Sequence, residues 1–140
     1  MTPKMMADMH ANAFAPERGW TAQEFEELLA SDYTQLNSHR HGFALIRTIA
    51  GEAELLTLAV VPDHQRQGIA DSLMHDWMRT APAEIAFLEV AADNTAAQAL
   101  YVKHGFAKAG LRKAYYARPN GPPIDAVLMR ASLTHRQSGQ

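Results

Sequence analysis

One acidic side chain interrupts an otherwise apolar segment of the sequence, and it is the first candidate for acid–base chemistry. Glu89 stands in the run 85–91, Ile-Ala-Phe-Leu-Glu-Val-Ala, which has the composition of a strand buried on both faces. A half-buried carboxylate at the end of such a strand can act as a general base, or it can pair with a lysine or arginine. Glu52 and Glu54, on a neighbouring predicted strand, are the alternative bases.

A second candidate site is the polar loop that joins a predicted strand to a predicted helix. The strand ends at Pro62, and the loop runs through Arg66 and Gly68 directly into the helix. Free N–H groups at a helix N-terminus, with the helix dipole behind them, favour phosphate oxygens. Gly68 permits close approach of a ligand, and Arg66 can add a charge-assisted contact. A glycine here is more often only a turn, and the loop lacks both the P-loop and the dinucleotide patterns.

Three tyrosines and an asparagine complete the set of candidates. Tyr101 lies near the end of a short predicted helix, where an aromatic ring usually fills the core but a phenol can also donate a proton. Asn94 is a suitable N-cap for the same helix. Tyr115 and Tyr116 precede a loop, and they form either a solvent-facing pair in a hairpin or one wall of a binding groove.

The composition fits a globular protein and argues against several classes of partner. The chain has 140 residues, of which 47% are hydrophobic and 20% charged, and its formal net charge is −2. That charge gives no electrostatic case for binding nucleic acid or a membrane. No cysteine is present, so disulfides and cysteine nucleophiles are excluded. The histidines lack metal-ligand spacing, no apolar run reaches the about 20 residues of a membrane span, and no signal peptide is evident. We therefore expect a cytoplasmic monomer without a metal.

The hydrophobic pattern predicts a mixed α/β fold that would position these residues. Helices are expected over about 4–14, 22–30, 68–80 and 95–103, and strands over 42–50, 53–61, 85–91, 106–112 and 124–131. A capping box, Thr21 with Glu24, begins the second helix, and Gly105 ends the last one. Residues 31–41 are expected to be irregular, and Met5, Met6, Met9, Met74 and Met78 to lie in the core. A single domain is expected over 1–133, followed by a flexible tail over 134–140.

Several segments together resemble one enzyme family. Residues 65–70, Gln-Arg-Gln-Gly-Ile-Ala, resemble the Arg/Gln-x-x-Gly-x-Gly/Ala motif of the GNAT acetyltransferase superfamily, whose loop binds the pyrophosphate of coenzyme A. Residues 54–60, 88–90, 94–97, 99–101 and 105–106 are similar to blocks of the RimI-type ribosomal-protein-alanine N-acetyltransferases. Residues 112–116, Arg-Lys-Ala-Tyr-Tyr, resemble the Arg-Arg-Asn-Tyr-Tyr segment of that group, and 125–129 its last strand. The resemblance covers roughly residues 12–133.

The resemblance implies an activity and a role for each candidate. The enzyme would transfer an acetyl group from acetyl-CoA to a protein N-terminal amine, with a ribosomal protein as the family's acceptor. Glu89 would be the general base, Tyr101 the general acid, and Tyr115 with Tyr116 a wall of the acceptor groove. The mostly antiparallel sheet would splay into a V, where the Val60 amide contacts the thioester carbonyl. Coenzyme contacts would come from Leu58, Ala59, Val60, Gln65, Arg66, Gln67, Gly68, Ile69, Ala70, Asp71, Ser72, Asn94, Ala97 and Tyr101.

A few positions depart from the family pattern and leave alternatives open. Ala91 stands where an arginine is usual, Ala70-Asp71 where Gly-Arg is usual, and Ala114 where an asparagine is common. Asp71 is expected to repel the phosphates. The family's first strand is missing before the first helix, so a truncated start is hypothesised, which an intact mass matching 140 residues would contradict. The alternatives are acetylation of a small amine or a lysine side chain, and a non-catalytic acyl-coenzyme A binding module.

Overall fold

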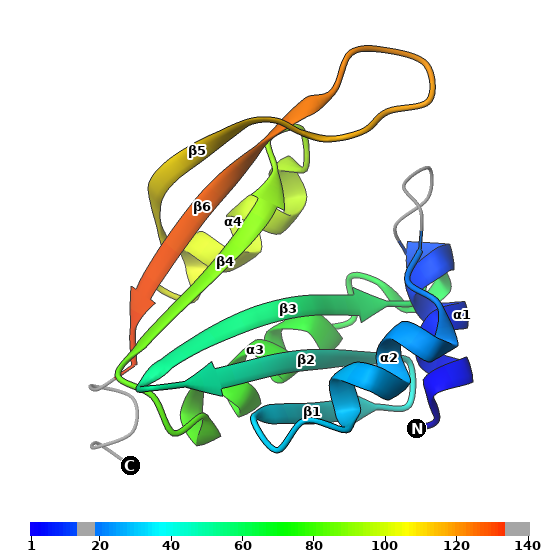
Figure 1. Cartoon of the computed structure of the whole chain (residues 1–140), viewed down its shortest axis with the longest axis vertical. Coiled ribbons are helices and arrows are strands. Elements are labelled where there is room, and N and C mark those ends of the chain that lie inside the picture. The colour runs from blue at the N-terminus through cyan, green and yellow to red at the C-terminus, as the bar shows by residue number, and fades with distance from the viewer. Residues whose placement is uncertain (14–18, 134–140) are drawn as a thin grey trace.

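The computed structural model describes residues 1–13 and 19–133, which form one six-stranded sheet flanked by four helices (Figure 1). The sheet order is β1-β2-β3-β4-β6-β5, and only the β3–β4 pair is parallel. The predicted mixed, mostly antiparallel fold is therefore confirmed. The helices are α1 (Pro3–Ala13), α2 (Ala22–Leu29), α3 (Ile69–Thr80) and α4 (Thr95–Lys103). The strands are β1 (Thr34–His39), β2 (Gly42–Ile49), β3 (Glu52–Val60), β4 (Ile85–Ala91), β5 (Ala107–Tyr116) and β6 (Ile124–Ser132).

Each face of the sheet is covered by different helices, so the core has two parts. On one face Trp77 and Met74 of α3 are fully buried against the sheet and against Tyr101 of α4. On the other face Met6 of α1 and Phe25 of α2 pack with residues of β2 and β3. Burial of these apolar surfaces is the main force that holds the helices on the sheet. The central strands therefore carry apolar residues on both sides, as the continuous apolar runs in the sequence predicted.

The sheet splits between β3 and β4. These strands are paired only at Glu52–Ile85, Ala53–Ala86 and Glu54–Phe87, after which they diverge (Figure 1). Just beyond the last pair, β3 contains a bulge. Leu55 and Thr57 stand opposite the consecutive β2 residues Ile46 and Leu45, so Leu56 is an extra residue of β3 without a partner position in β2. A bulge of this kind bends and twists its strand, and it turns β3 away from β4 at this point. The expected V-shaped opening is confirmed.

Most predicted elements are present, and two expectations were wrong. Residues 34–39, expected to be irregular, form β1. This strand pairs with β2 alone and is half exposed, so its sequence, Thr-Gln-Leu-Asn-Ser-His, shows no apolar alternation. Met5, expected in the core, is 46% exposed, because it lies on the outer side of α1 while Met6 is buried. No strand precedes α1 among the described residues, and no helix in the described part of the chain is long and apolar enough to cross a membrane.

Strand β5 extends further than predicted because a bulge interrupts its pattern. Arg112 pairs with Ala126 and Tyr116 with Ile124, so three residues of β5 stand opposite Asp125. At the centre of the bulge Ala114 has a φ of 51°, and its N–H donates to Asp125 Oδ1 at 2.8 Å. The left-handed conformation is unfavourable for alanine, because its Cβ crowds the following carbonyl.

Replacing Ala114 with glycine is therefore expected to stabilise the protein. Glycine has no Cβ, so it adopts the left-handed conformation without the steric cost that alanine has. Its greater flexibility in the unfolded chain offsets part of this gain, so the free energy of unfolding should rise by roughly 0.5 to 1 kcal/mol. Chemical denaturation would measure the change. The matched control is Ala107→Gly in the same strand, where φ is not positive and the change should destabilise. A loss of stability in Ala114→Gly similar to that of the control would contradict the prediction.

Candidate active site

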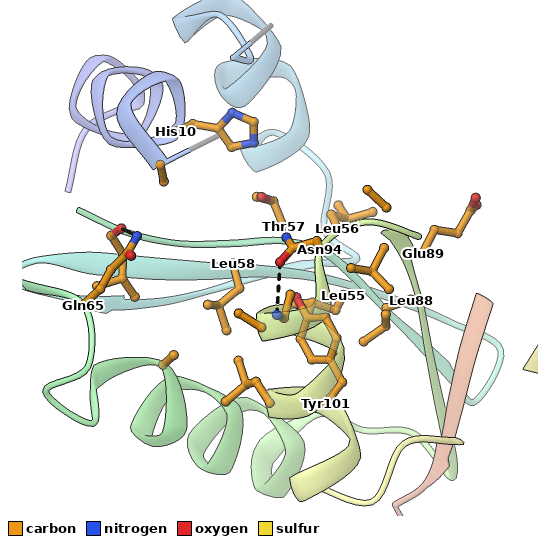
Figure 2. A pocket seen from close by; sticks show the side chains of 18 of the residues that line it. His10, Leu55, Leu56, Thr57, Leu58, Gln65, Leu88, Glu89, Asn94 and Tyr101 are labelled. Atoms are coloured by element: carbon orange, nitrogen blue, oxygen red, sulfur yellow. Dashed lines mark hydrogen bonds between the residues drawn. The ribbon is translucent and has the colours of Figure 1, made fainter. Parts of the chain in front are cut away.

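A cleft of about 500 Å³ opens where β3 and β4 separate (Figure 2). Its wall is built from both strands, from the loop before α3, from α4 and from one side of α1. The structure thus brings together residues from distant parts of the sequence that had been predicted to act together. The predicted site residues that line the cleft are Leu58, Val60, Gln65, Arg66, Ala70, Glu89, Asn94, Ala97, Tyr101 and Tyr116.

Glu89 presents one carboxylate oxygen without a partner at the cleft wall. Its Oε1 lies 3.2 Å from Nη2 of Arg112, so the ion pair that the sequence left as an alternative is present. Its Oε2 is buried and has no hydrogen-bond partner among the described residues. A buried, unpaired carboxylate oxygen is costly, and such atoms concentrate at functional sites. The side chain is therefore held by a cation through one oxygen, while the hydrogen-bonding capacity of the other oxygen is unused among the described residues. Glu52 and Glu54, the alternative bases, do not line it.

Tyr101 reaches the cleft from the face of the sheet opposite to Glu89. Its ring belongs to the core cluster that contains Leu88 and Val90, the neighbours of Glu89 in β4. Since successive side chains of a strand alternate between faces, Glu89 points away from that cluster. Burial, with a smaller contribution from Tyr116, raises the pKa of the Tyr101 phenol well above its ordinary value of 10. The phenol therefore remains protonated across the physiological range and can act only as a proton donor there.

The loop before α3 has a backbone suited to anion binding. Arg66 and Gly68 both have left-handed φ values, 65° and 83°, and α3 begins at the next residue, Ile69. The first N–H groups of a helix lack intrahelical acceptors, so they are available to a ligand. A Cβ on Gly68 would meet no atom within 4 Å, which leaves open space beside these N–H groups. Gln65 closes the loop by donating its Nε2–H to the Val60 carbonyl at 3.1 Å.

The N-terminus of α4 forms another part of the wall. Asn94 accepts a hydrogen bond from the Ala97 N–H at 3.1 Å, so the predicted N-cap is confirmed. Gln98 donates to the carbonyls of Ala91 and Ala92, each at 3.1 Å, and fixes the turn that follows β4. Both the turn and the cap hold Tyr101 at a set position relative to β4.

Some predicted site residues lie outside the main cleft. Gly68, Ile69 and Asp71 line a smaller adjoining hollow of about 100 Å³, together with several loop residues that border both spaces. Ala59 is buried on the other face of the sheet, in the cluster of α1 and α2. The remaining predicted residues that do not line the cleft are exposed on the surface: Gln67, Ser72 and Tyr115.

Asp71 does not present an uncompensated negative charge to a phosphate. Its Oδ1 lies 3.1 Å from Lys103 Nζ and 2.9 Å from His104 Nε2, both at the end of α4. The hydrogen bond from His104, followed by that from Lys103, lowers the pKa of the Asp71 carboxyl. The repulsion expected from the sequence is therefore offset by two basic side chains that it did not place nearby.

The pKa of the Asp71 carboxyl is lower in the folded protein than in the unfolded chain, where it is about 4. The stability that the ionised carboxylate contributes is therefore present above about pH 4, and it is lost as the pH falls through the folded-state pKa. Asp71 is partly exposed, so Asp71→Asn should lower the free energy of unfolding by less than about 1 kcal/mol at pH 7. Denaturation at pH 7 and pH 3 would measure this, and the loss should disappear at pH 3. The control is Asp76→Asn, at an exposed position of the same helix, which should leave the free energy of unfolding unchanged at both pH values. An equal loss at both pH values would contradict the assignment.

The sequence did not reveal one side of the cleft. His10 and Trp20 line it from α1 and from the segment before α2. His10 is buried, and its ring stacks on that of Trp20 with 4.9 Å between centroids. Its Nδ1 accepts a hydrogen bond from the backbone N–H of Trp20 at 3.1 Å. The only signal in the sequence was a histidine on the apolar side of a short helix, which is more often a core residue. Further lining residues that were not predicted are Ala13, Leu55, Leu56, Thr57, Leu88, Val90, Ala91, Ala96 and Leu100.

Comparison with known proteins shows similarity to one group of enzymes. The model of the acetyltransferase (GNAT) family matches residues 6–106. The [ribosomal protein bS18]-alanine N-acetyltransferase of Escherichia coli K12 is 35% identical over 131 residues, which cover 91% of this chain and 87% of that protein. The N-alpha-acetyltransferase RimI of Mycobacterium tuberculosis is 35% identical over 133 residues, which cover 89% and 82%.

Solved structures agree with this similarity. The crystal structure of the ribosomal-protein-S18-alanine N-acetyltransferase from Escherichia coli superimposes with a TM-score of 0.82 at 27% identity, over 96% of this chain and 89% of that one. A spermidine N-acetyltransferase from Vibrio cholerae, in complex with coenzyme A and spermine, gives a TM-score of 0.75 at 19% identity, over 94% and 90%. At 19% identity, the similarity to the spermidine N-acetyltransferase shows a shared fold and nothing about the acceptor.

Proposed function

The chain belongs to the GNAT family of acetyl-CoA-dependent acetyltransferases, and we propose that it acetylates the N-terminal α-amine of a protein. The observation that carries the proposal is the cleft itself. It runs from the loop before α3, through the opening between β3 and β4, to Glu89, whose Oε2 has no hydrogen-bond partner in the described part of the chain. A long acyl donor and an amine acceptor can therefore meet inside it from two sides.

The residues present fit coenzyme A at the loop and along the opening. The first N–H groups of α3, the open space beside Gly68 and the charge of Arg66 suit the pyrophosphate. Leu58, Ala97 and Leu100 offer an apolar wall between the loop and Tyr101, which suits a flexible arm. Val60, at the end of β3, remains the predicted contact of the thioester carbonyl through its backbone amide.

Glu89 and Tyr101 would divide the proton transfers. An α-amine loses its proton with a pKa near 8, so a modest base is sufficient to supply the nucleophile at neutral pH. Glu89 would accept this proton on Oε2, while the amine nitrogen forms its bond to the thioester carbon. As the carbon–sulfur bond breaks, Tyr101 would donate its proton to the departing sulfur. Glu89 points from one face of β4, and Tyr101 of α4 packs against the other face. Each group can therefore act on one side of the reacting carbon.

The charge of the cleft favours a peptide over a polyamine as acceptor. Among its lining residues in the described part of the chain, Glu89 is the only acid. A polyamine carries several positive charges, and a site for it needs several carboxylates. Tyr116, His10 and Trp20 instead give the acceptor side an aromatic wall with a few polar atoms, which suits the first residues of a peptide. The acceptor named for the E. coli relative, the alanine of ribosomal protein bS18, is the one to test first.

A ribosomal acceptor would place the enzyme in the cytoplasm, and we expect it to act as a monomer with one catalytic domain over residues 1–133. The predicted tail, 134–140, lies outside the described residues. The test of the proposed function is release of free thiol from acetyl-CoA with peptides that begin with Ala, Ser or Met, and with spermidine as a control. Turnover only with an Ala- or Ser-led peptide is expected. Turnover with spermidine alone would contradict it, as would coenzyme binding with no turnover on any acceptor.

A further inference from the structure

We propose that Arg112 is a positioning residue, which holds the Glu89 carboxylate in its working orientation, and that Tyr115 holds Arg112. The inference rests on the proposed role of Glu89 as the base. It concerns a contact between two strands that are not neighbours in the sheet. Arg112 lies on β5 and Glu89 on β4, with β6 between them.

The sheet register explains how Arg112 reaches Glu89. Glu89 stands opposite Leu128, and Arg112 stands opposite Ala126, two residues away on the same face of β6. The side chain of Arg112 therefore runs diagonally across β6 to Glu89 Oε1, at 3.2 Å from Nη2. Ala126 is fully buried and small, so it leaves room for this path. A larger residue there would stand between the two strands on the same face.

Tyr115 fixes the other side of the guanidinium group. The Arg112 Cζ lies 4.7 Å from the centre of the Tyr115 ring, a cation–π distance. The Tyr115 ring packs edge-on against Tyr116, with centroids 5.0 Å apart and an interplanar angle of 83°. The bulge that places Tyr115 is held by the bond from the Ala114 N–H to Asp125 at 2.8 Å. Tyr115, outside the cleft, thereby acts through Arg112 on Glu89, which lines the cleft.

This arrangement assigns different tasks to the two oxygens of Glu89. Arg112 occupies Oε1, and Oε2 remains buried without a partner among the described residues. A free glutamate side chain would sample several rotamers, and a misplacement of the base by about 1 Å can lower a rate about a hundredfold. Arg112 is 52% exposed on its side chain, so the ion pair contributes little to folding stability. Its expected effect is therefore on turnover rather than on stability.

The test is a double-mutant cycle of Glu89→Gln and Arg112→Gln in the full chain, measured by thiol release with acetyl-CoA and an Ala-led peptide. Arg112→Gln alone should lower kcat about tenfold to a hundredfold, with the acetyl-CoA dissociation constant and the unfolding midpoint unchanged. Arg112→Lys keeps the charge but loses the planar stack on Tyr115, so it should recover part of the loss. Arg130→Gln, on the same face of the sheet and outside the cleft, is the matched control and should retain full activity.

In the double variant the two losses should not add. If Arg112 acts through Glu89, removing it from the Glu89→Gln enzyme has no further effect. Additive losses, or full activity in Arg112→Gln, would overturn the inference while the role of Glu89 stands. Full activity in Glu89→Gln would instead overturn the base assignment, so the two failures are distinguishable. An unfolding midpoint lowered in Arg112→Gln, together with additive losses, would assign Arg112 a structural role.

Discussion

Glu89→Gln is expected to lower the turnover number by about two to four orders of magnitude, the usual contribution of a general base. Glutamine has nearly the same shape, but it cannot accept the amine proton. It also lacks the charge that pairs with Arg112 at 3.2 Å. Coenzyme affinity should change little, because the loop before α3, the proposed site of the pyrophosphate, is formed by residues remote from Glu89 in the cleft wall. Steady-state thiol release would give the turnover number, and calorimetric titration with coenzyme A would give the affinity.

The matched control is Glu54→Gln. Glu54 is a half-buried glutamate of the neighbouring strand, and it also pairs with an arginine, Arg47, at 2.9 Å. It does not line the cleft, so its replacement should leave turnover within about twofold. If Glu54→Gln abolished turnover and Glu89→Gln did not, the base would have to be sought on β3 rather than on β4.

Tyr101→Phe is expected to lower turnover about a hundredfold, again with little change in coenzyme affinity. The phenol is buried at the end of the opening, and burial raises its pKa, which favours the protonated form at neutral and mildly alkaline pH. No loss of activity between pH 7 and pH 9 should therefore come from its ionisation. The measurement is the pH profile of kcat/KM for both enzymes, with Tyr33→Phe, exposed on the surface, as control. Unchanged turnover in Tyr101→Phe would remove the assignment of the general acid.

The same pKa shift predicts how stability changes at high pH. A folded pKa above the unfolded value means that the contribution of Tyr101 is fully present below about pH 10 and is lost as the pH rises toward the folded value. Phenylalanine has no proton to lose. Denaturation at pH 8 and pH 11 should therefore show a smaller alkaline loss of stability in Tyr101→Phe than in the parent. An equal loss in both would contradict the raised pKa.

Local signals in the sequence were sufficient for most of the fold. The capping box at Thr21 and Glu24 has both of its hydrogen bonds, at 3.1 and 3.0 Å, and Asn94 caps α4 as expected. The apolar run around Glu89 is a strand with the same bounds as predicted. These features depend on residues a few positions apart, and their physical cause is local. The edge strand β1 could not be predicted in this way, because its pairing with β2, rather than its own polar sequence, determines it.

The candidate site was predicted where it depends on one segment and missed where it depends on several. The loop before α3 and the strand of Glu89 could be identified one at a time. The pairing of Arg112 with Glu89 depends on β6 standing between β4 and β5, an order that no local pattern contains. The same holds for His10, whose position at the cleft depends on α1 packing over β3. The left-handed Ala114 was visible only as a departure from the asparagine common in the family.

The place of β6 in the sheet also bears on how the enzyme is made. β6 is the last of the described strands in the sequence, yet it lies between β4 and β5 and is the main partner of both. A nascent chain that has emerged only as far as β5 has β4 joined to the sheet by the three pairs with β3 alone. Domains generally fold as units, so we expect the sheet to complete its pairing only once β6 is available. Until residues 124–132 have been synthesised, β4 and β5 lack their shared neighbour, so these strand edges are open to pairing with other chains.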